Sequence, residues 1–516
     1  MLRIKNHSNK LSWRHVTANR YISSSTSIPP PPPPPVTLGG IDSDLSIVNH
    51  KEIDRLLSEL GPFPSYSSIL NQRHFYQNEI LINYSKRDPH PVSLRQLAGY
   101  GKRLTKQKIL ASANFVRMEL PIRLSMRIRD LQTLPFGMVN NFHMTQIYES
   151  YYHSFNAFRK IQPITTTQQN DQFCETLSTL LDDHVFNLPH LMMGALEVSI
   201  LSNKSNDGGQ DPHDLDKFMS VMLRSRLSRR VIVEEHLSLT ENYKSSPNFD
   251  KPADFIGEIF AQCNAQQHLQ QVAHTVRESM KPIWPDVETM PAVEIDGDVN
   301  TTFPFMIPHL HYLFGEILRN SYQATILKAK EGHNDSSNSE LQQASSQSGK
   351  LPPIRITVVN SPHEITFRIS DQGGGIPHEH LSNIFSFAKS PNLAKQSLAN
   401  FHRIPGLQLH HNLKVTPAGS SIVDPSAAAS QEALFSQTSL SDHSDKSTSS
   451  KQSTLSSLVG RAHEHKFGLG LPMCRVYADY WNGNLSMDSL EGYGTDTCLT
   501  LKKLGYHSNV LQLDRA

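Results

Sequence analysis

The sequence predicts two domains, an N-terminal all-α antiparallel helical bundle and a C-terminal α/β sandwich. The chain has 516 residues, enough for roughly two to four domains. Apolar residues recur at helical spacing through 51–245, whereas apolar and polar residues alternate with a period of two in parts of 250–505. The two regions therefore favour different kinds of secondary structure.

Charge and composition exclude several classes of protein. Lys and Arg number 49 and Asp and Glu 48, which gives a net charge of +1. This balance argues against a large sequence-independent nucleic-acid interface, which would need a basic surface. No apolar run is long enough to predict a transmembrane helix. The four cysteines are scattered without a CxxC pair, so neither a disulfide framework nor a zinc site is expected.

The N-terminus has the composition of a targeting segment. Residues 1–22 contain several Arg and Lys, and the first acidic residue of the chain is Asp42. A basic, acid-free and Ser-rich start without a continuous apolar core predicts a mitochondrial transit peptide and a place in the mitochondrial matrix. A disordered basic tail is the alternative. Residues 23–50 are expected to form a Pro/Ser-rich linker, with the seven prolines of 29–35 as a polyproline II spacer.

Amphipathic patterns indicate the helices expected in 51–245, the predicted regulatory domain. From Ile109 to Leu120, apolar residues recur at i, i+4, i+7 and i+11, the spacing of one buried helix face. The pattern recurs in three further stretches, 124–131, 173–184 and 215–237. Several such helices in succession favour an antiparallel bundle.

Two arginines interrupt the apolar stripe of the last of these helices. Arg226 and Arg230 lie one turn apart on that stripe. Two guanidinium groups on a buried face need an anionic partner. The partner is either a facing carboxylate, such as that of Asp182 or Asp183, or a small anion in a pocket. The residues alone leave both open.

Strands and helices are mixed in 250–505. Residues 354–358 and 365–369 each alternate apolar with polar side chains, the pattern of a strand with one buried face. Helices are expected at about 308–330 and 469–481. This order predicts one sheet backed by helices.

Low-complexity stretches interrupt the C-terminal region. Residues 333–350 and 403–460 are rich in Ser, Gln and Asn, and such composition buries too little apolar surface to offset chain entropy. We expect both to be insertions into the C-terminal domain, and residues 506–516 to be a short tail.

Polar residues on the helix at 308–330 point to chemistry. Glu316 and Asn320 are one turn apart and share a face. A carboxylate there could orient or deprotonate a nucleophile, and an amide oxygen could hold a Mg²⁺ ion that bridges phosphates. Taken alone the pair is weak evidence, because Glu and Asn are common on helix surfaces.

Three glycine-rich stretches follow in order. Residues 370–377 (SDQGGGIP) come directly after a strand, where Asp371 could accept a hydrogen bond from an exocyclic amine and the glycines allow close approach of a planar ligand. Residues 467–472 (FGLGLP) precede a helix whose free N–H groups could bind phosphate. Residues 492–495 (GYGT) read alone as a hairpin turn that could add the Thr495 hydroxyl.

The series Glu-x-x-x-Asn, DxGGG, GxGL and GxGT resembles the boxes of the Bergerat ATP-binding fold, shared by histidine kinases, gyrase and mismatch-repair ATPases. The surrounding residues are similar to the mitochondrial 2-oxoacid dehydrogenase kinases. The similarity is carried by SLRQL at 93–97, by 113–135, by the RSRLSRR helix, by ISDQGGGIP and by 475–496. It covers about 90–505, apart from the insertions.

The resemblance implies a role for each matching residue. Glu316 is expected to be the general base for a substrate serine, Asn320 the protein ligand of Mg²⁺, and Arg226 and Arg230 the lining of a regulatory 2-oxoacid pocket. The remaining positions are expected to bind ATP: Arg319, Asp371, Gly373, Gly375, Ser390, Phe467, Gly468, Leu469, Gly470, Leu471 and Thr495. ATP and Mg²⁺ are the implied cofactors, with K⁺ as a candidate further ion.

Several positions depart from the family pattern. Tyr312 stands where pyruvate-type members often have a histidine that assists the base, and Lys466 replaces the first glycine of the phosphate loop. The chain ends at Ala516, and the short C-terminus is expected to alter docking on a lipoyl domain. A homodimer is expected from the resemblance alone.

The sequence leads to one main functional hypothesis. The chain is expected to be an ATP-dependent serine kinase that phosphorylates and inactivates the dehydrogenase component of the pyruvate dehydrogenase complex. The branched-chain 2-oxoacid dehydrogenase complex is the alternative substrate. A histidine autokinase using His236 as acceptor, and a non-catalytic ATP-gated scaffold, are further alternatives.

Overall fold

The computed structural model describes residues 78–139, 141–202, 212–245, 251, 255–282, 284–285, 290–335, 351–403, 454–459, 461 and 468–504. The expected transit peptide, the proline linker and the C-terminal tail lie outside these residues, as do Phe467 and Lys466. None of the described helices is long and apolar enough to cross a membrane.

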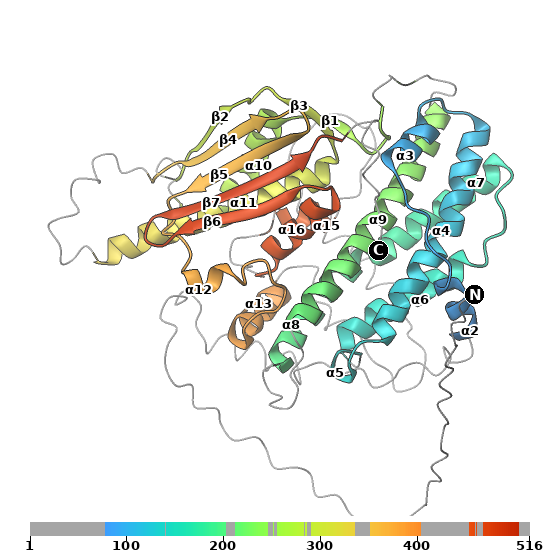
Figure 1. The fold of residues 1–516 in the computed structure, drawn as a ribbon, viewed down its shortest axis with the longest axis horizontal. Coiled ribbons are helices and arrows are strands. Elements are labelled where there is room, and N and C mark those ends of the chain that lie inside the picture. The colour runs from blue at the N-terminus through green and yellow to red at the C-terminus, as the bar shows by residue number, and fades with distance from the viewer. Residues whose placement is uncertain are drawn as a thin grey trace, which may run out of the picture. The chain divides into compact units, whose positions relative to one another are not determined.

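Helices make up the described part of the chain up to residue 245 (Figure 1). They are α2 (Asn78–Ser85), α3 (Leu94–Gly101), α4 (Lys106–Gln132), α5 (Phe136–Val139), α6 (Phe142–Phe158), α7 (Thr167–Asp183), the 3₁₀ turn η2 (His184–Phe186), α8 (Asn187–Ser202) and α9 (Pro212–Ser245). The long helices α4, α6, α8 and α9 pack side by side, as the amphipathic patterns predict. Helix α4 runs through Pro121 without ending.

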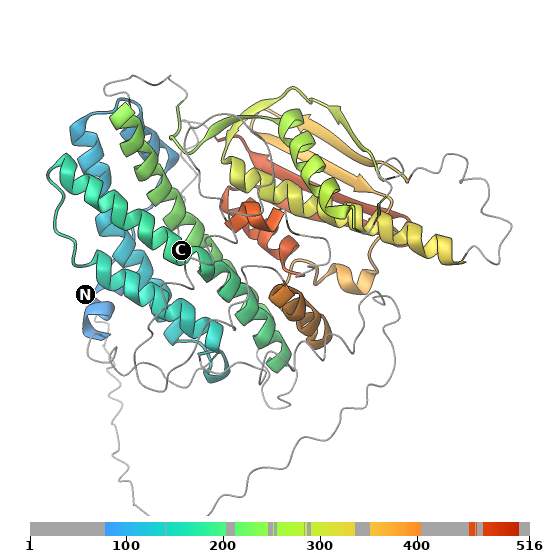
Figure 2. The ribbon, with the colours of Figure 1, turned by 180° about the vertical axis from the view of Figure 1, so that it is seen from behind.

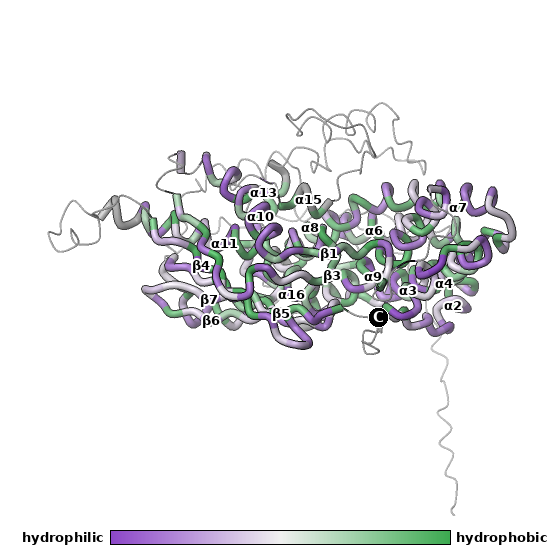
Figure 3. The backbone as a smooth tube through the Cα atoms, turned by 90° about the horizontal axis from the view of Figure 1, so that it is seen from above, coloured by the Kyte–Doolittle hydropathy of each residue, from purple (hydrophilic) through white to green (hydrophobic). Residues whose placement is uncertain are grey.

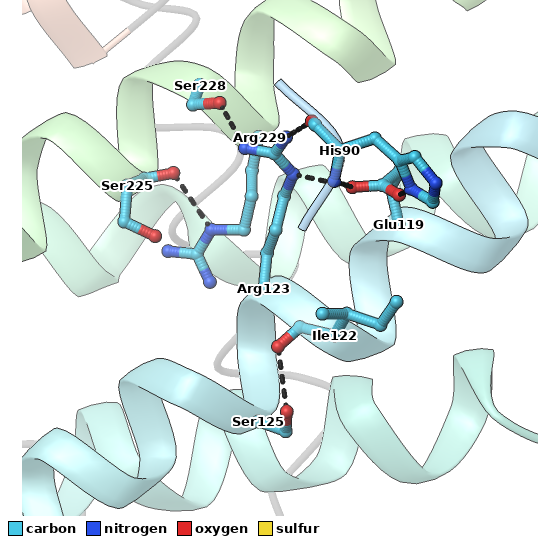
Figure 4. Close-up of polar contacts among 8 residues, drawn as sticks. All are labelled: His90, Glu119, Ile122, Arg123, Ser125, Ser225, Ser228 and Arg229. Atoms are coloured by element: carbon cyan, nitrogen blue, oxygen red, sulfur yellow. Dashed lines mark hydrogen bonds and ion pairs between the residues drawn. The ribbon is translucent and has the colours of Figure 1, made fainter. Parts of the chain in front are cut away.

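A buried polar contact fixes α9 against α4 (Figure 4). The Arg123 guanidinium on α4 donates to Glu119 Oε2 at 3.3 Å, to Ser228 Oγ on α9 at 2.8 Å, and to the His90 carbonyl at 2.7 Å. The Arg123 and Glu119 side chains are almost fully buried and form an ion pair, so each neutralises the buried charge of the other. The contact therefore holds in place the helix that carries Arg226 and Arg230.

A mixed sheet with the strand order β2-β4-β5-β7-β6 forms the centre of the second region. The strands are β2 (Val293–Gly297), β4 (Ile354–Asn360), β5 (Glu364–Asp371), β6 (Asn484–Leu490) and β7 (Gly494–Lys502). β2 and β4 are parallel and the other neighbours are antiparallel. A separate antiparallel pair joins β1 (Ala261–Asn264) to β3 (Thr302–Phe305). The two strands expected at 354–358 and 365–369 are confirmed as β4 and β5.

Helices α10 (Ala265–Met280), α11 (Ile307–Asp335) and α16 (Gly470–Tyr480) cover one face of this sheet (Figures 1 and 2). The described helices between β5 and α16 in sequence are α12 (His378–Leu381), α13 (Pro391–Arg403) and α15 (Thr454–Val459). The coarse expectation of a helical N-terminal part and an α/β part is confirmed. Hydrophobic and hydrophilic residues both occur along each helix (Figure 3), as expected where one face of a helix is buried and the other is exposed.

Both predicted insertions contain some ordered structure at their ends. α11 extends to Asp335, into the stretch expected to begin at residue 333. α15 lies inside the stretch 403–460, and its Leu455, Leu458 and Val459 are buried. The stretch expected to be an insertion at 403–460 thus contains one short apolar run that packs on a neighbouring helix.

Candidate active site

Helix α11 is the element along which the four predicted stretches meet. Gly470, at the start of α16, lies so close to Glu316 that a Cβ there would be 2.1 Å from Glu316 Oε2. Five residues after Glu316 on α11, Ser321 donates a hydrogen bond to the Asp371 carboxyl. A Cβ at Gly373 would lie 2.4 Å from Ala324 Cβ. The stretches that are separated by up to 179 residues in sequence, from Glu316 to Thr495, therefore converge on successive turns of one helix.

Asp371 ends β5 and links the DxGGG and GxGT stretches. Its Oδ1 accepts the backbone N–H of Gly373 at 3.0 Å and that of Thr495 at 3.3 Å. Asp371 and Thr495 are also paired residues of β5 and β7. Burial raises the pKa of Asp371, while the hydrogen bonds from Gly373, Ser321 and Thr495 act in the opposite direction. The carboxyl is thus held in a fixed orientation by groups of the protein itself.

Two glycines of the DxGGG stretch are required by its geometry. Gly373 packs directly on the backbone of α11, where a side chain would also come within 2.9 Å of the Thr325 nitrogen. Gly375 has a φ of +75° and would place a Cβ 2.2 Å from the Leu490 carbonyl oxygen. Only glycine tolerates both the positive φ and the close approach.

The GxGL stretch forms the N-terminus of α16. Gly468 is exposed with a φ of +65°, Leu469 is buried and precedes the helix, and Gly470 and Leu471 begin it. Among the residues that the structure describes, no side chain caps this end of α16. Its first N–H groups are therefore available to an anion, as expected for a phosphate-binding turn. Phe467 lies outside the described residues.

Glu316 and its neighbours on α11 differ in their exposure. Glu316 is buried and Asn320 is half-buried. Arg319 is buried, and its guanidinium donates to the Val459 carbonyl at 2.5 Å and to Ser279 Oγ at 3.4 Å. Burial and the nearby Arg461 guanidinium lower the pKa of Arg319 to about 9. Arg319 is therefore directed toward α10 and α15, away from the Asp371 end of α11.

Tyr312 is buried on α11, four residues before Glu316. Its hydroxyl donates to Met473 Sδ at 3.6 Å. Burial, and secondly the Glu316 carboxylate, raise the pKa of Tyr312 well above its ordinary value. Tyr312 therefore remains protonated at neutral pH.

Ser390 lies apart from these groups, at the start of α13. It is exposed, and its carbonyl accepts the first helical hydrogen bond from Ala394 at 2.9 Å. The residues before it are bound to the helical region, where Asp216 Oδ1 on α9 accepts the Phe387 backbone N–H at 2.6 Å. The structure thus ties the segment preceding Ser390 to α9 and brings no contact between Ser390 and Asp371 or Glu316.

Arg226 and Arg230 line a small cavity in the helical region. The cavity has a volume of about 40 Å³, and its other lining residues include Leu120, Leu124, Tyr151, Leu180 and His184. Burial and the neighbouring Arg230 lower the pKa of Arg226 to about 10. Arg226 Nε is buried, and none of the described residues hydrogen bonds to it. Arg230 pairs with Glu234 on its own helix.

Two cationic or polar residues of this cavity are not evident from the sequence. Arg229 donates to the Tyr151 hydroxyl at 2.8 Å and lies over its ring. His184 has its pKa lowered to about 3 by burial and by Arg229 and Arg226. Arg229 lies three residues after Arg226 on α9, whereas the packing of α7 and α8 around α9 brings His184 to these arginines. The described residues give Arg226 no carboxylate partner, which favours the small-anion alternative over an ion pair with Asp182 or Asp183.

Arg461 is the main residue of the site that sequence reasoning missed. It donates to both carboxylate oxygens of Glu316, at 2.8 Å to Oε2. It lies directly after the Ser-rich stretch 403–460, two residues beyond α15. Neither periodicity nor motif spacing connects it with α11, so the sequence held no signal for this contact.

Comparison with known proteins assigns the chain to a family. Residues 91–260 match the family model of the mitochondrial branched-chain alpha-ketoacid dehydrogenase kinase. The chain is 38% identical to pyruvate dehydrogenase (acetyl-transferring) kinase 2, mitochondrial, of Saccharomyces cerevisiae, over 91% of this chain and 93% of that protein. It is 28% identical to the Arabidopsis thaliana mitochondrial kinase, over 80% and 90% of the two chains, and 23% identical to human isozyme 4, over 83% and 84%. The chain therefore belongs to the mitochondrial 2-oxoacid dehydrogenase kinase family.

Proposed function

We propose that this chain is a mitochondrial ATP-dependent protein serine kinase that phosphorylates and inactivates the dehydrogenase component of the pyruvate dehydrogenase complex. The observation that carries the proposal is the 38% identity, over nearly the whole of both chains, to a kinase named for pyruvate dehydrogenase. The branched-chain name belongs to a model that matches residues 91–260 only, which are largely helical. We give more weight to the full-length relatives, and the branched-chain complex remains the second candidate.

The arrangement along α11 suits an extended nucleotide in a Bergerat-type site. Eight residues separate Glu316 from Ala324, which is roughly 12 Å of helix. Asp371 would read the adenine at one end, against Gly373, and the N-terminus of α16 would accept the phosphates at the other. We propose the same domain division as the sequence suggests, with 51–245 regulatory and 250–505 catalytic.

Asn320 is the proposed ligand of Mg²⁺. The described residues hold no cluster of three or more His, Cys, Asp or Glu side chains that could bind a metal. A Mg²⁺ ion usually keeps several waters and takes other oxygens from phosphates, so one half-buried amide on α11 fits that need. When bound, ATP would supply the phosphoryl group, and Mg²⁺ would neutralise charge on the phosphates.

Each residue of the proposed site then has a defined role. Glu316 accepts the proton of the substrate serine hydroxyl. The N–H groups at Gly470 and Leu471 position the phosphates, and Asp371 orients the base. Catalysis of phosphoryl transfer rests mainly on such positioning and on charge stabilisation. Homodimer formation, lipoyl-domain docking and a role for K⁺ remain predictions of the family resemblance.

The histidine-autokinase alternative is less consistent with the fold. His236 is fully buried in α9, where its Nδ1 is 3.0 Å from Ser112 Oγ. Burial lowers the pKa of His236 to about 4. A phospho-acceptor must reach a nucleotide, and a histidine enclosed by α4 and α7 does not.

The proposal is tested by offering the chain purified pyruvate and branched-chain dehydrogenase complexes with labelled ATP and Mg²⁺. Acid-stable label on the pyruvate dehydrogenase component, with loss of its activity, is the expected result. The Glu316→Gln variant should still bind ATP and lose transfer. Full transfer by Glu316→Gln would contradict the assignment of the base, and acid-labile label on the chain itself would support the autokinase.

A further inference from the structure

The proposed catalytic base is engaged by an arginine from outside α11. The Arg461 guanidinium binds both oxygens of the Glu316 carboxylate and also donates to the Leu458 carbonyl at 2.7 Å. Both side chains are nearly fully buried. A bidentate, charge-assisted pair of this kind fixes the carboxylate as well as neutralising it.

A packed helix delivers this arginine. Leu455, Leu458 and Val459 of α15 are buried, and Val459 lies against Gly315, where an added Cβ would be 3.0 Å from its Cγ1. The Val459 carbonyl also accepts a hydrogen bond from Arg319. The position of Arg461 is therefore set by contacts of α15 with the turn of α11 that carries Glu316.

The contact conflicts with proton transfer. A general base needs a carboxylate oxygen within hydrogen-bond reach of the hydroxyl that it deprotonates. Here both oxygens are occupied by one guanidinium, and Oε2 faces Gly470 at the N-terminus of α16. The same guanidinium stands beside the turn that we assign to the phosphates. The guanidinium therefore lies between the Glu316 carboxylate and the turn proposed to bind the phosphates.

We propose that Arg461 is a positioning residue that locks Glu316, and that a nucleoside triphosphate at the N-terminus of α16 releases the lock by competing for the guanidinium. This inference rests on the proposed function, because it takes Glu316 as the base. The physical basis is the small net stability of a buried ion pair, whose desolvation offsets much of its attraction. Burial by itself lowers the pKa of Arg461, but the Glu316 carboxylate outweighs it and holds that pKa above its ordinary value, so the cation persists.

The kinetic test compares three variants of the full chain. Arg461→Gln removes the lock, Arg461→Lys keeps the charge without the bidentate geometry, and Arg355→Gln removes an exposed arginine on β4 as a control. Because ATP itself releases the lock, the lock slows transfer at limiting ATP. If it holds most molecules, the rate of transfer at limiting ATP rises about threefold to tenfold in Arg461→Gln, less in Arg461→Lys, and not in Arg355→Gln. An unchanged or lower rate at limiting ATP in Arg461→Gln overturns the proposal.

A second measurement needs no phosphorylation. The Tm values of Glu316→Gln, Arg461→Gln and the double variant give the coupling of the pair. They are recorded with and without saturating Mg²⁺ and a non-hydrolysable ATP analogue. The lock predicts coupling without the analogue and its loss with it. Coupling that persists in an analogue-stabilised chain overturns the lock, whereas a wild-type chain that the analogue fails to stabilise overturns the proposed function instead.

Discussion

Replacing Arg226 by Met tests whether the cavity in the helical region is built for an anion. Burial and Arg230 lower the pKa of Arg226 from 12.5 to about 10. A shift of this size corresponds to about 3 kcal/mol by which folding disfavours the charged form. The penalty applies at every pH below the folded-state pKa, hence at neutral pH, and is relieved only as the pH rises above 10. Methionine keeps the apolar stem without the charge, so Arg226→Met should raise the free energy of unfolding by about 1–3 kcal/mol in anion-free buffer.

The assay is thermal and chemical unfolding of the wild-type chain and Arg226→Met, with and without a small 2-oxoacid such as pyruvate. An anion that binds the folded state stabilises the wild type in proportion to the logarithm of its concentration, and the variant should show none of this increase. Arg355→Gln, on the exposed surface of β4, is the matched loss of one positive charge and should respond like the wild type. A fall in stability of Arg226→Met of 2 kcal/mol or more, with pyruvate having no effect on either chain, would show that Arg226 holds a structural ion pair and would refute the anion pocket.

Two further predictions concern the nucleotide site and the buried histidines. Gly373→Ala should abolish binding of a fluorescent ATP analogue while the helical content stays unchanged, because the new Cβ would meet Ala324 Cβ at 2.4 Å. Displacing the loop by overpacking costs roughly 1–3 kcal/mol. Wild-type affinity in this variant would show that the DxGGG loop is not part of the site. His309 has its pKa lowered to about 3 by burial and by Arg230 and Arg226, so the unfolded chain binds a proton near pH 6.5 that the folded chain does not. Stability should therefore fall as the pH drops from 6.5 toward 3, by up to about 1.4 kcal/mol per pH unit for this residue, and His309→Gln should flatten the fall in urea titrations; an unchanged slope would contradict the shifted pKa.

Part of the fold follows from local pattern. Strands β4 and β5 coincide with the alternation read from 354–358 and 365–369, and α16 begins at the glycines that predicted it. Such elements are predictable because one buried face imposes a period on the sequence. Pro121 shows where this reasoning stops: a proline favours a helix end, yet in α4 the residue is buried and the flanking turns are held by packing against α6 and α9. Glu316, Asp371 and the glycine loops were singled out by their order and spacing together, because each stretch taken alone is common in proteins.

The sequence by itself determined which residue types and which motifs are present, and hence the family and the class of reaction. Only the tertiary structure decided which of them meet. Gly470 lies on Glu316, Ser321 on Asp371, and Arg461 on Glu316, across separations from 50 to 154 residues. Long-range partners of this kind leave no periodic trace, because a buried charge needs a counter-charge in space and not at any fixed distance along the chain. For that reason the sequence could single out Glu316 as a candidate, and it could not single out the arginine that binds its carboxylate.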